Sequence, residues 1–248
     1  MVIDNTSYFR YDDDIPLIIP EVNSCKIREY KNRNIVANPN CSTIQMLVAL
    51  KPIYDAVGIK RITVSTYQAV SGSGTAAVNE LAKQTAELLN GRDAEYEVYP
   101  RQIAFNALPH IDKFLDNGYT KEEMKMCWET RKIFEDESID VSATCVRIPV
   151  FFGHSEAVQV ETLEYISETE VRNLLKQAEG ITVIDERRDG GYPTAVHESA
   201  GSDSVFIGRI RQDISLENGL SLWVVSDNVR KGAALNSVQI AEELIKVM

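Results

Sequence analysis

The order of strand and helix patterns limits the fold of this chain more than any other feature. Helical periodicity, with breakers at the ends, marks residues 42–58, 75–91, 121–137, 167–180 and 229–248. Strand-like sequences mark residues 60–70, 140–150, 155–164, 205–213 and 219–227, with two short strands at 1–4 and 34–37. Strand and helix alternate in the first half, and strands dominate after residue 139. This order predicts an α/β fold in which a mixed, largely antiparallel β-sheet has helices on one face.

Charge and cysteine usage narrow the classes of partner. The chain has a net charge of −11 and no long run of Lys or Arg, which argues against nucleic acid and anionic membranes as partners. Its four cysteines lie far apart, without the spacing of metal ligands. We find neither a signal-peptide pattern nor an apolar run of membrane-spanning length. We therefore expect a reduced, cytoplasmic protein without a metal site, whose partners are small molecules and protein.

The sequence NPNCST, residues 38–43, places a cysteine between a turn and an apolar helix. Asn-Pro-Asn favours a turn, and Ser42 and Thr43 are common at helix starts. Unpaired N–H groups and the helix dipole favour a thiolate at such a position, so Cys41 is a candidate nucleophile. The alternative is a small buried apolar residue, the usual role of a free cysteine. Pro52 is expected to interrupt the helix before a second short turn that runs to Gly58.

The sequence GSGTAA, residues 72–77, fits the glycine-rich pattern of dinucleotide-binding turns. Such a turn belongs to the first βα unit of its domain, whereas here a strand and a helix precede it. No further parallel βα unit follows its helix. We therefore interpret the match as a coincidence, although a glycine-rich turn lets backbone approach a ligand closely.

Charged residues on regular elements provide the remaining candidates. Glu129 and Lys132 lie three apart on one helix face, where a solvated ion pair is the simpler interpretation. Alternation places Arg147 on a small apolar strand face, so its guanidinium needs an anion, either from a ligand or from an internal Asp or Glu. His154 follows just beyond this strand and, with Cys41, would complete a nucleophile and base.

Several segments together resemble the aspartate-semialdehyde dehydrogenase family. They are VIDNTSYFRYDDDIPLIIPEVN, NPNCST, YQAVSGSG, EEMKM with ETRKI, SATCVRIPVFFGHSE and SDNVRKGAALNSVQIAE. Each is a weak signal alone. Together they stand in the family's order, at near-family spacing, over nearly the whole chain.

The resemblance implies a role for each candidate residue. Cys41 would be the nucleophile that forms an acyl thioester, and His154 the general acid and base. Substrate contacts are implied for Gln68, which also belongs to the catalytic set, and for Asn40, Arg147, Glu129 and Lys132. Within this set the arginine binds the substrate carboxylate, the glutamate its amino group and the lysine the phosphate. Ser71, Gly72 and Asn228 resemble positions that contact the cofactor NADP.

The implied reaction is the reductive dephosphorylation of 4-aspartyl phosphate to L-aspartate 4-semialdehyde with NADPH. In the family this step serves the biosynthesis of lysine, threonine and methionine, and the β-rich domains pair into a homodimer. Two alternatives stay open. One is an N-acetyl-gamma-glutamyl-phosphate reductase, a related enzyme with a similar cysteine, and the other is a non-catalytic dimerisation module.

The resemblance also predicts the domain boundaries. Family members begin with a glycine-rich nucleotide-binding segment that has no counterpart in the 248 residues. Residues 1–40 are therefore expected to be the last part of a Rossmann-like dinucleotide-binding domain. Residues 41–227 would form the catalytic and dimerisation domain. Residues 228–248 would be a helix that packs back on the dinucleotide-binding domain.

Overall fold

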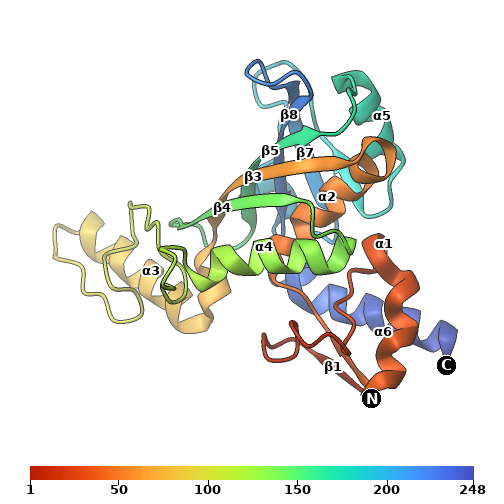
Figure 1. Cartoon of the computed structure of the whole chain (residues 1–248). Coiled ribbons are helices and arrows are strands. Elements are labelled where there is room, and N and C mark those ends of the chain that lie inside the picture. The colour runs from red at the N-terminus through yellow and green to blue at the C-terminus, as the bar shows by residue number, and fades with distance from the viewer.

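The computed structural model describes all 248 residues, as two β-sheets with helices packed around them (Figure 1). Its helices are α1 (Pro20–Asn23), α2 (Cys41–Val57), α3 (Thr75–Leu89), α4 (Lys121–Phe134), α5 (Glu168–Gln177) and α6 (Leu235–Val247). Its strands are β1 (Val2–Asp4), β2 (Ile35–Ala37), β3 (Ile59–Gln68), β4 (Asp140–Arg147), β5 (His154–Thr162), β6 (Ile181–Val183), β7 (Val205–Gln212) and β8 (Gly219–Ser226). Four shorter helical segments complete it: η1 (Ser24–Asn32), η2 (Val70–Ser73), η3 (Ala195–Ser199) and η4 (Arg230–Ala234).

The main sheet brings three of the candidate residues to one edge. Its six strands follow the order β4-β3-β5-β8-β7-β6. The inner pairs β3–β5, β5–β8 and β7–β8 are antiparallel, and the outer pairs β3–β4 and β6–β7 are parallel. Gln68, at the end of β3, pairs with Arg147, at the end of β4, and His154 starts the antiparallel neighbour β5.

One face of the main sheet is covered by helices α2, α4 and α5, and the apolar core lies between these layers (Figure 1). Helix α2 is central, because it packs against α4, α5 and four strands of the sheet, β3, β5, β7 and β8. The predicted mixed α/β sheet with helices on one face is confirmed. The short strand β6 was not predicted, since three residues are too few for a periodic signal.

Helix α2 runs through Pro52 without a break. A proline inside a helix removes one backbone hydrogen bond and costs about 3 kcal/mol. Leu50 and Ile53, on either side of it, are completely buried in the core. Because packing along α2 outweighs the local cost, the predicted interruption at Pro52 is wrong.

The first 40 residues and the last helix form a second layer beside the main sheet (Figure 1). Strands β1 and β2 pair in parallel, and α6 packs against η1, α1 and β1. A separate apolar cluster joins these parts through Ile18, Ile27, Tyr30, Val36, Ile240 and Leu244. In the same layer the buried Lys231 pairs with Glu21 at 2.6 Å.

Helix α3 and the loop after it project away from the main sheet and have a small apolar cluster of their own (Figure 1). This arm leaves β3 through residues 69–74, directly beside the edge where the candidate residues meet. None of the helices combines the length and the apolar composition needed to cross a bilayer.

Candidate active site

Cys41 is the first residue of α2, as the sequence predicted, but the residue that caps the helix is Asn40. The Asn40 side-chain oxygen accepts a hydrogen bond from the backbone N–H of Ser42 at 3.0 Å. The cysteine is partly exposed. Gly232 packs against it so closely that a Cβ there would lie 2.7 Å from the Cys41 Cβ, so a side chain at position 232 would displace the thiol.

Burial is the largest influence on the Cys41 thiol and favours its protonated form. Burial and the Glu122 carboxylate raise the pKa of Cys41 to about 12, whereas Arg147, Arg10 and the Ser42 N–H act in the opposite direction. The Ser42 N–H at the helix start lowers the pKa of this thiol, as expected, but burial and Glu122 outweigh it, so the net shift is opposite to the predicted one. Nothing in the local sequence around Cys41 indicates that a carboxylate lies close to the sulfur.

Glu122, on the first turn of α4, is the centre of a polar cluster beside Cys41. Its Oε1 accepts hydrogen bonds from the side-chain amides of Asn40 at 3.0 Å and Gln68 at 3.1 Å. Its Oε2 accepts one from Lys125 at 2.9 Å. Burial opposes ionisation, but Lys125 and the two amides outweigh it and lower the pKa of Glu122. Gln68 also donates to the Ser42 hydroxyl, which ties β3 to the first turn of α2.

Arg147 is buried without a carboxylate partner. Its Nη1 donates to the backbone oxygen of Ala69 at 2.6 Å, and its Nε has no hydrogen-bond partner in the protein. The sequence left two possible anion partners for Arg147, a ligand or an internal Asp or Glu. The structure has no Asp or Glu paired with this guanidinium. A buried guanidinium in this state is suited to bind an external carboxylate or phosphate.

His154 lies beside Arg147 in a fixed tautomer. Its Nδ1 accepts a hydrogen bond from the Ala69 N–H at 3.0 Å, so in the neutral ring the proton is on Nε2. Burial and the neighbouring Arg147 hold the pKa of His154 well below its usual value. Nε2 has no partner in the protein. The imidazole is therefore a neutral ring with a free N–H donor.

The three residues that the resemblance assigns to the cofactor lie next to this ring. A Cβ at Gly72 would come within 2.9 Å of Arg147 Nη1 and 3.4 Å of His154, so the glycine lets the turn approach both. The Ser71 hydroxyl and the Asn228 amide are hydrogen bonded. Asn228 Oδ1 also accepts from the N–H of Gly153, the residue before His154, at 3.0 Å. Residues that are 157 apart in sequence thus form one wall of the site.

Glu129 and Lys132 are not part of this cluster. Glu129 is completely buried, and both of its oxygens have partners within the protein, Arg10 and the Asn40 backbone N–H. Lys132 donates to the backbone oxygens of Arg10 and Asp12, at 2.9 and 2.6 Å. The two residues do not pair with each other, so the interpretation as a solvated ion pair is wrong.

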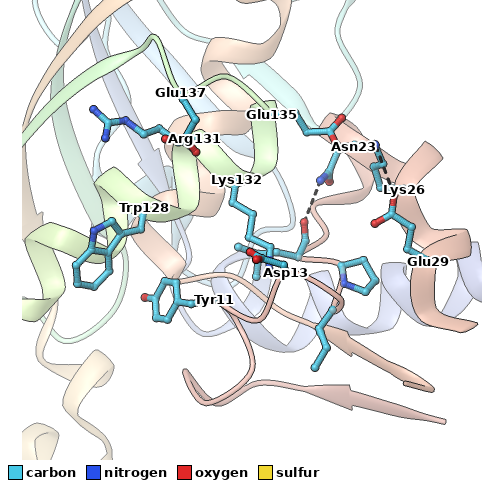
Figure 2. Close-up of a pocket in the computed structure, with 13 residues that line it drawn as sticks. Tyr11, Asp13, Asn23, Lys26, Glu29, Trp128, Arg131, Lys132, Glu135 and Glu137 are labelled. Atoms are coloured by element: carbon cyan, nitrogen blue, oxygen red, sulfur yellow. Dashed lines mark hydrogen bonds and ion pairs between the residues drawn. The ribbon is translucent and has the colours of Figure 1, made fainter. Parts of the chain in front are cut away.

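Lys132 instead lines a separate cavity of about 620 Å³, shown in Figure 2. In that view the Lys132 side chain points from α4 towards the N-terminal segment near Asp13, with Tyr11 and Trp128 to one side. The cavity includes neither Cys41 nor His154. The structure thus separates Lys132 from the candidate nucleophile.

Three residues of the site region were missed from the sequence: Glu122, Lys125 and Arg10. A signal was available for two of them, since Glu122 and Lys125 repeat the three-residue spacing of Glu129 and Lys132 one heptad earlier on the same helix face. No local pattern marks Arg10, whose ion-pair partner Glu129 lies 119 residues away in sequence.

Comparison with known proteins defines the class. The family model described as "Semialdehyde dehydrogenase, dimerisation domain" matches residues 50–231, which places the chain in the semialdehyde dehydrogenase class. A relative from Shewanella violacea named "Aspartate-semialdehyde dehydrogenase" is 64% identical over 246 residues, which cover 99% of this chain and 72% of the relative. The chain belongs to the aspartate-semialdehyde dehydrogenase family.

Solved structures agree with this assignment. The Vibrio cholerae aspartate semialdehyde dehydrogenase II complexed with ASA has a TM-score of 0.97 and 62% identity, over 99% of this chain and 72% of that one. A more distant structure, aspartate semialdehyde dehydrogenase with NADP from Candida albicans, has a TM-score of 0.72 and 25% identity, over 98% of this chain and 70% of that one. These similarities do not favour the alternative of an N-acetyl-gamma-glutamyl-phosphate reductase.

Proposed function

We propose that this site interconverts 4-aspartyl phosphate and L-aspartate 4-semialdehyde through a thioester on Cys41. The observation that carries the proposal is the unpaired, buried Arg147 next to a neutral His154, at the edge of the sheet that faces the first turn of α2. The arrangement offers a nucleophile, a proton donor and an anion-binding group in one place.

Cys41 attacks the acyl carbon of the phosphorylated substrate, the C–O bond to phosphate breaks, and a thioester forms. The thiol is protonated in the free protein, so its proton has to leave during this step. The departing phosphate is a suitable acceptor, because it leaves as a strongly basic oxyanion. Before the C–O bond breaks, the backbone N–H groups at the start of α2 stabilise the negative charge on the acyl oxygen of the tetrahedral intermediate.

His154 donates a proton or a hydrogen bond through Nε2. Its neighbour Ala69 occupies Nδ1 as a donor, so a protonated ring would place two hydrogens against each other. The ring is therefore suited to donate to the oxygen of the hemithioacetal rather than to store the thiol proton. This gives His154 the acid half of the acid and base role that the resemblance implied.

We assign the substrate amino group to Glu122 and the phosphate to Lys125, in place of Glu129 and Lys132. Glu122 is ionised, lies close enough to Cys41 to raise its pKa and binds Asn40 and Gln68. Lys125 is the cation bound to it. Arg147, on the other side, is free for the substrate carboxylate, as its fork of donors suits this anion.

The residues of this wall fit a nicotinamide cofactor. Ser71, Gly72 and Asn228 would hold NADP, because Gly72 leaves the backbone open beside His154 and the two polar side chains form a hydrogen-bonding rim. When bound, NADPH supplies the hydride that reduces the thioester. The structure solved with NADP from Candida albicans supports this choice of cofactor.

The assembly is proposed to be a homodimer formed through the sheet face opposite the helices. That face presents Tyr67 and Trp223, which are only partly buried and have ring centroids 5.6 Å apart. Segment η3 covers part of this face over β7 and β8, and a second copy that covers the remainder would stabilise the sheet further. The dimerisation-domain family match, which includes all of these strands, supports the same conclusion.

Glu122 also discriminates between the two reductases. The substrate of an N-acetyl-gamma-glutamyl-phosphate reductase has no free amino group, so a buried carboxylate beside the nucleophile would face a neutral amide. A free ammonium group suits that carboxylate better. The site therefore favours L-aspartate 4-semialdehyde.

Alkylation of Cys41 tests the proposal without turnover. L-aspartate 4-semialdehyde adds the thiol across its aldehyde, so it should protect Cys41 from iodoacetamide, as read by mass spectrometry. N-acetylglutamate semialdehyde should protect at least tenfold less. Replacement Arg147→Gln should remove the protection. Equal protection by both aldehydes would contradict the substrate assignment, and no protection by either would point to the non-catalytic module.

A further inference from the structure

The side chain of Glu129 bridges the turn before the nucleophile and the N-terminal segment. One carboxylate oxygen accepts the backbone N–H of Asn40 at 2.7 Å, and the other accepts Arg10 Nη1 at 3.0 Å. Glu129 is completely buried and Arg10 nearly so. Neither carboxylate oxygen is left for a substrate, so its function has to be sought in these two contacts.

The contact with Asn40 acts on the residue that directs Cys41. As the cap of α2, Asn40 has extended backbone angles, and its own N–H lies outside the helix, where no helical carbonyl can accept it. Glu129 is the acceptor for this N–H. A buried N–H without an acceptor is costly enough to turn the peptide to another orientation. Because Cys41 follows directly, such a turn would redirect its thiol.

The contact with Arg10 fixes the other end of the bridge. Arg10 also donates through Nη2 to the backbone oxygen of Asn5 at 3.3 Å, in the loop after β1. The bridge thus connects three parts of the chain: the loop after β1, the third turn of α4 and the first turn of α2.

We propose that Glu129 is a positioning residue: paired with Arg10, it holds the Asn40 peptide so that Cys41 faces the substrate, and it does not contact the substrate itself. The proposal rests on the nucleophilic role of Cys41 argued above. It gives the N-terminal segment a direct mechanical connection to the nucleophile, since Arg10 belongs to that segment.

The same pair has a second, electrostatic effect on Cys41. The charged groups that face the thiol are Glu122 on α4, Arg147 on β4 and Arg10 in the N-terminal segment, and Arg10 lowers its pKa. Glu129 partly neutralises Arg10 through the ion pair. Removing the Glu129 charge should therefore strengthen the effect of Arg10 on the thiol, and removing Arg10 should abolish it.

The experiment compares alkylation and aldehyde protection of Cys41 in the 248-residue protein and its variants. In Glu129→Gln, alkylation at pH 7.5 should be faster by up to about tenfold, which corresponds to one unit in the thiol pKa. In Arg10→Gln it should be slower by a similar factor. Protection by L-aspartate 4-semialdehyde should weaken at least fivefold in Glu129→Gln although its thiol is more reactive. Unfolding would also raise reactivity and lower capture, because it exposes the buried thiol, so the result counts only where the buried Cys127 and Cys145 still label slowly.

Two further variants keep the test decisive. Glu129→Asp retains the charge but is one methylene too short to reach both Arg10 and Asn40, so it should keep wild-type alkylation and still lose protection. Arg131→Gln, on the same helix, removes a cation that bonds only to the Ile139 carbonyl and should change neither quantity. Slow labelling of the buried Cys127 and Cys145 monitors folding in every variant.

The outcomes separate the two proposals. Wild-type protection of Cys41 with unchanged protection in Glu129→Gln and Glu129→Asp would overturn the positioning role and leave the proposed function intact. Absence of protection in the wild-type protein would refute the proposed function. Unfolding of both Glu129 variants would assign this residue to stability alone and likewise overturn the positioning role.

Discussion

The first and third turns of helix α4 carry the same short pattern, Glu-x-x-Lys, in very different surroundings. Glu122 and Lys125 pair with each other and with the amides of Asn40 and Gln68 beside the nucleophile. Glu129 and Lys132 do not pair, and each bonds to the N-terminal segment instead. Both turns lie on the same helix face, so the sequence pattern cannot distinguish them.

The two carboxylates also differ in charge balance. Burial opposes the charge of both, but Lys125 and the two amides outweigh it at Glu122 and lower its pKa. At Glu129 burial is the larger influence and raises the pKa, although Arg10 and the Asn40 N–H oppose it. An ionised carboxylate that shares its oxygens with amides suits ligand binding, whereas a completely enclosed one suits a structural connection.

The largest expected difference between the two turns is in stability. Glu129→Ala leaves the Arg10 guanidinium buried without a counter-ion, which should lower the free energy of unfolding by about 3–5 kcal/mol. Glu122→Ala should cost about 1–2 kcal/mol, because Lys125 retains its ion pair with Asp112 at 2.8 Å. Urea unfolding of both variants measures the difference. Equal losses would show that the two glutamates contribute equally to the free energy of unfolding.

For substrate capture we expect the opposite order: replacing Glu122 should have the larger effect and replacing Glu129 the smaller. Glu122→Gln removes the anion assigned to the substrate ammonium, so protection of Cys41 by L-aspartate 4-semialdehyde should fall about tenfold to a hundredfold. Cys41 should also alkylate faster, since Glu122 raises its pKa. Lys121→Gln, on the same turn, is the matched control. Undiminished protection in Glu122→Gln would show that another residue binds the substrate ammonium group.

The smallest effect is in the pH dependence of stability. The folded-state pKa of Glu122 is lowered, so its stabilisation is present above the unfolded value of about 4.3 and lost on acidification. The destabilisation by Glu122→Gln should therefore shrink as the pH falls. The pKa of Glu129 is raised, so its contribution is present at low pH and lost as the pH rises. The destabilisation by Glu129→Gln should therefore shrink as the pH rises, as urea midpoints across pH 3–7 would show.

Most of the fold was predictable because its signals are local. The capping box of Thr120 and Glu123 marks the start of α4, and both of its hydrogen bonds are present. Strict alternation placed Arg147 on the buried face of β4. The predicted break at Pro52 was wrong because the rule describes an isolated helix, whereas α2 is packed on several sides.

The site was predictable only in part. The position of Cys41 at a helix start follows from six consecutive residues, and the resemblance assigned His154 and Arg147 to the same reaction. Which glutamate of α4 faces the cysteine did not follow, because two candidates share one face and one spacing. The thiol pKa also did not follow, since it depends on Glu122, 81 positions further along the chain.

The sequence by itself determined the order of the strands and helices, the placement of Cys41 at the start of α2 and the family. These depend on residues within a few positions of each other, or on a pattern spread over the whole chain. Only the tertiary structure decided which charges surround the thiol and which carboxylate remains free for a ligand. Hydrogen bonds such as that from Asn40 to Glu129 join residues 89 apart, and burial then sets the strength of every charge involved.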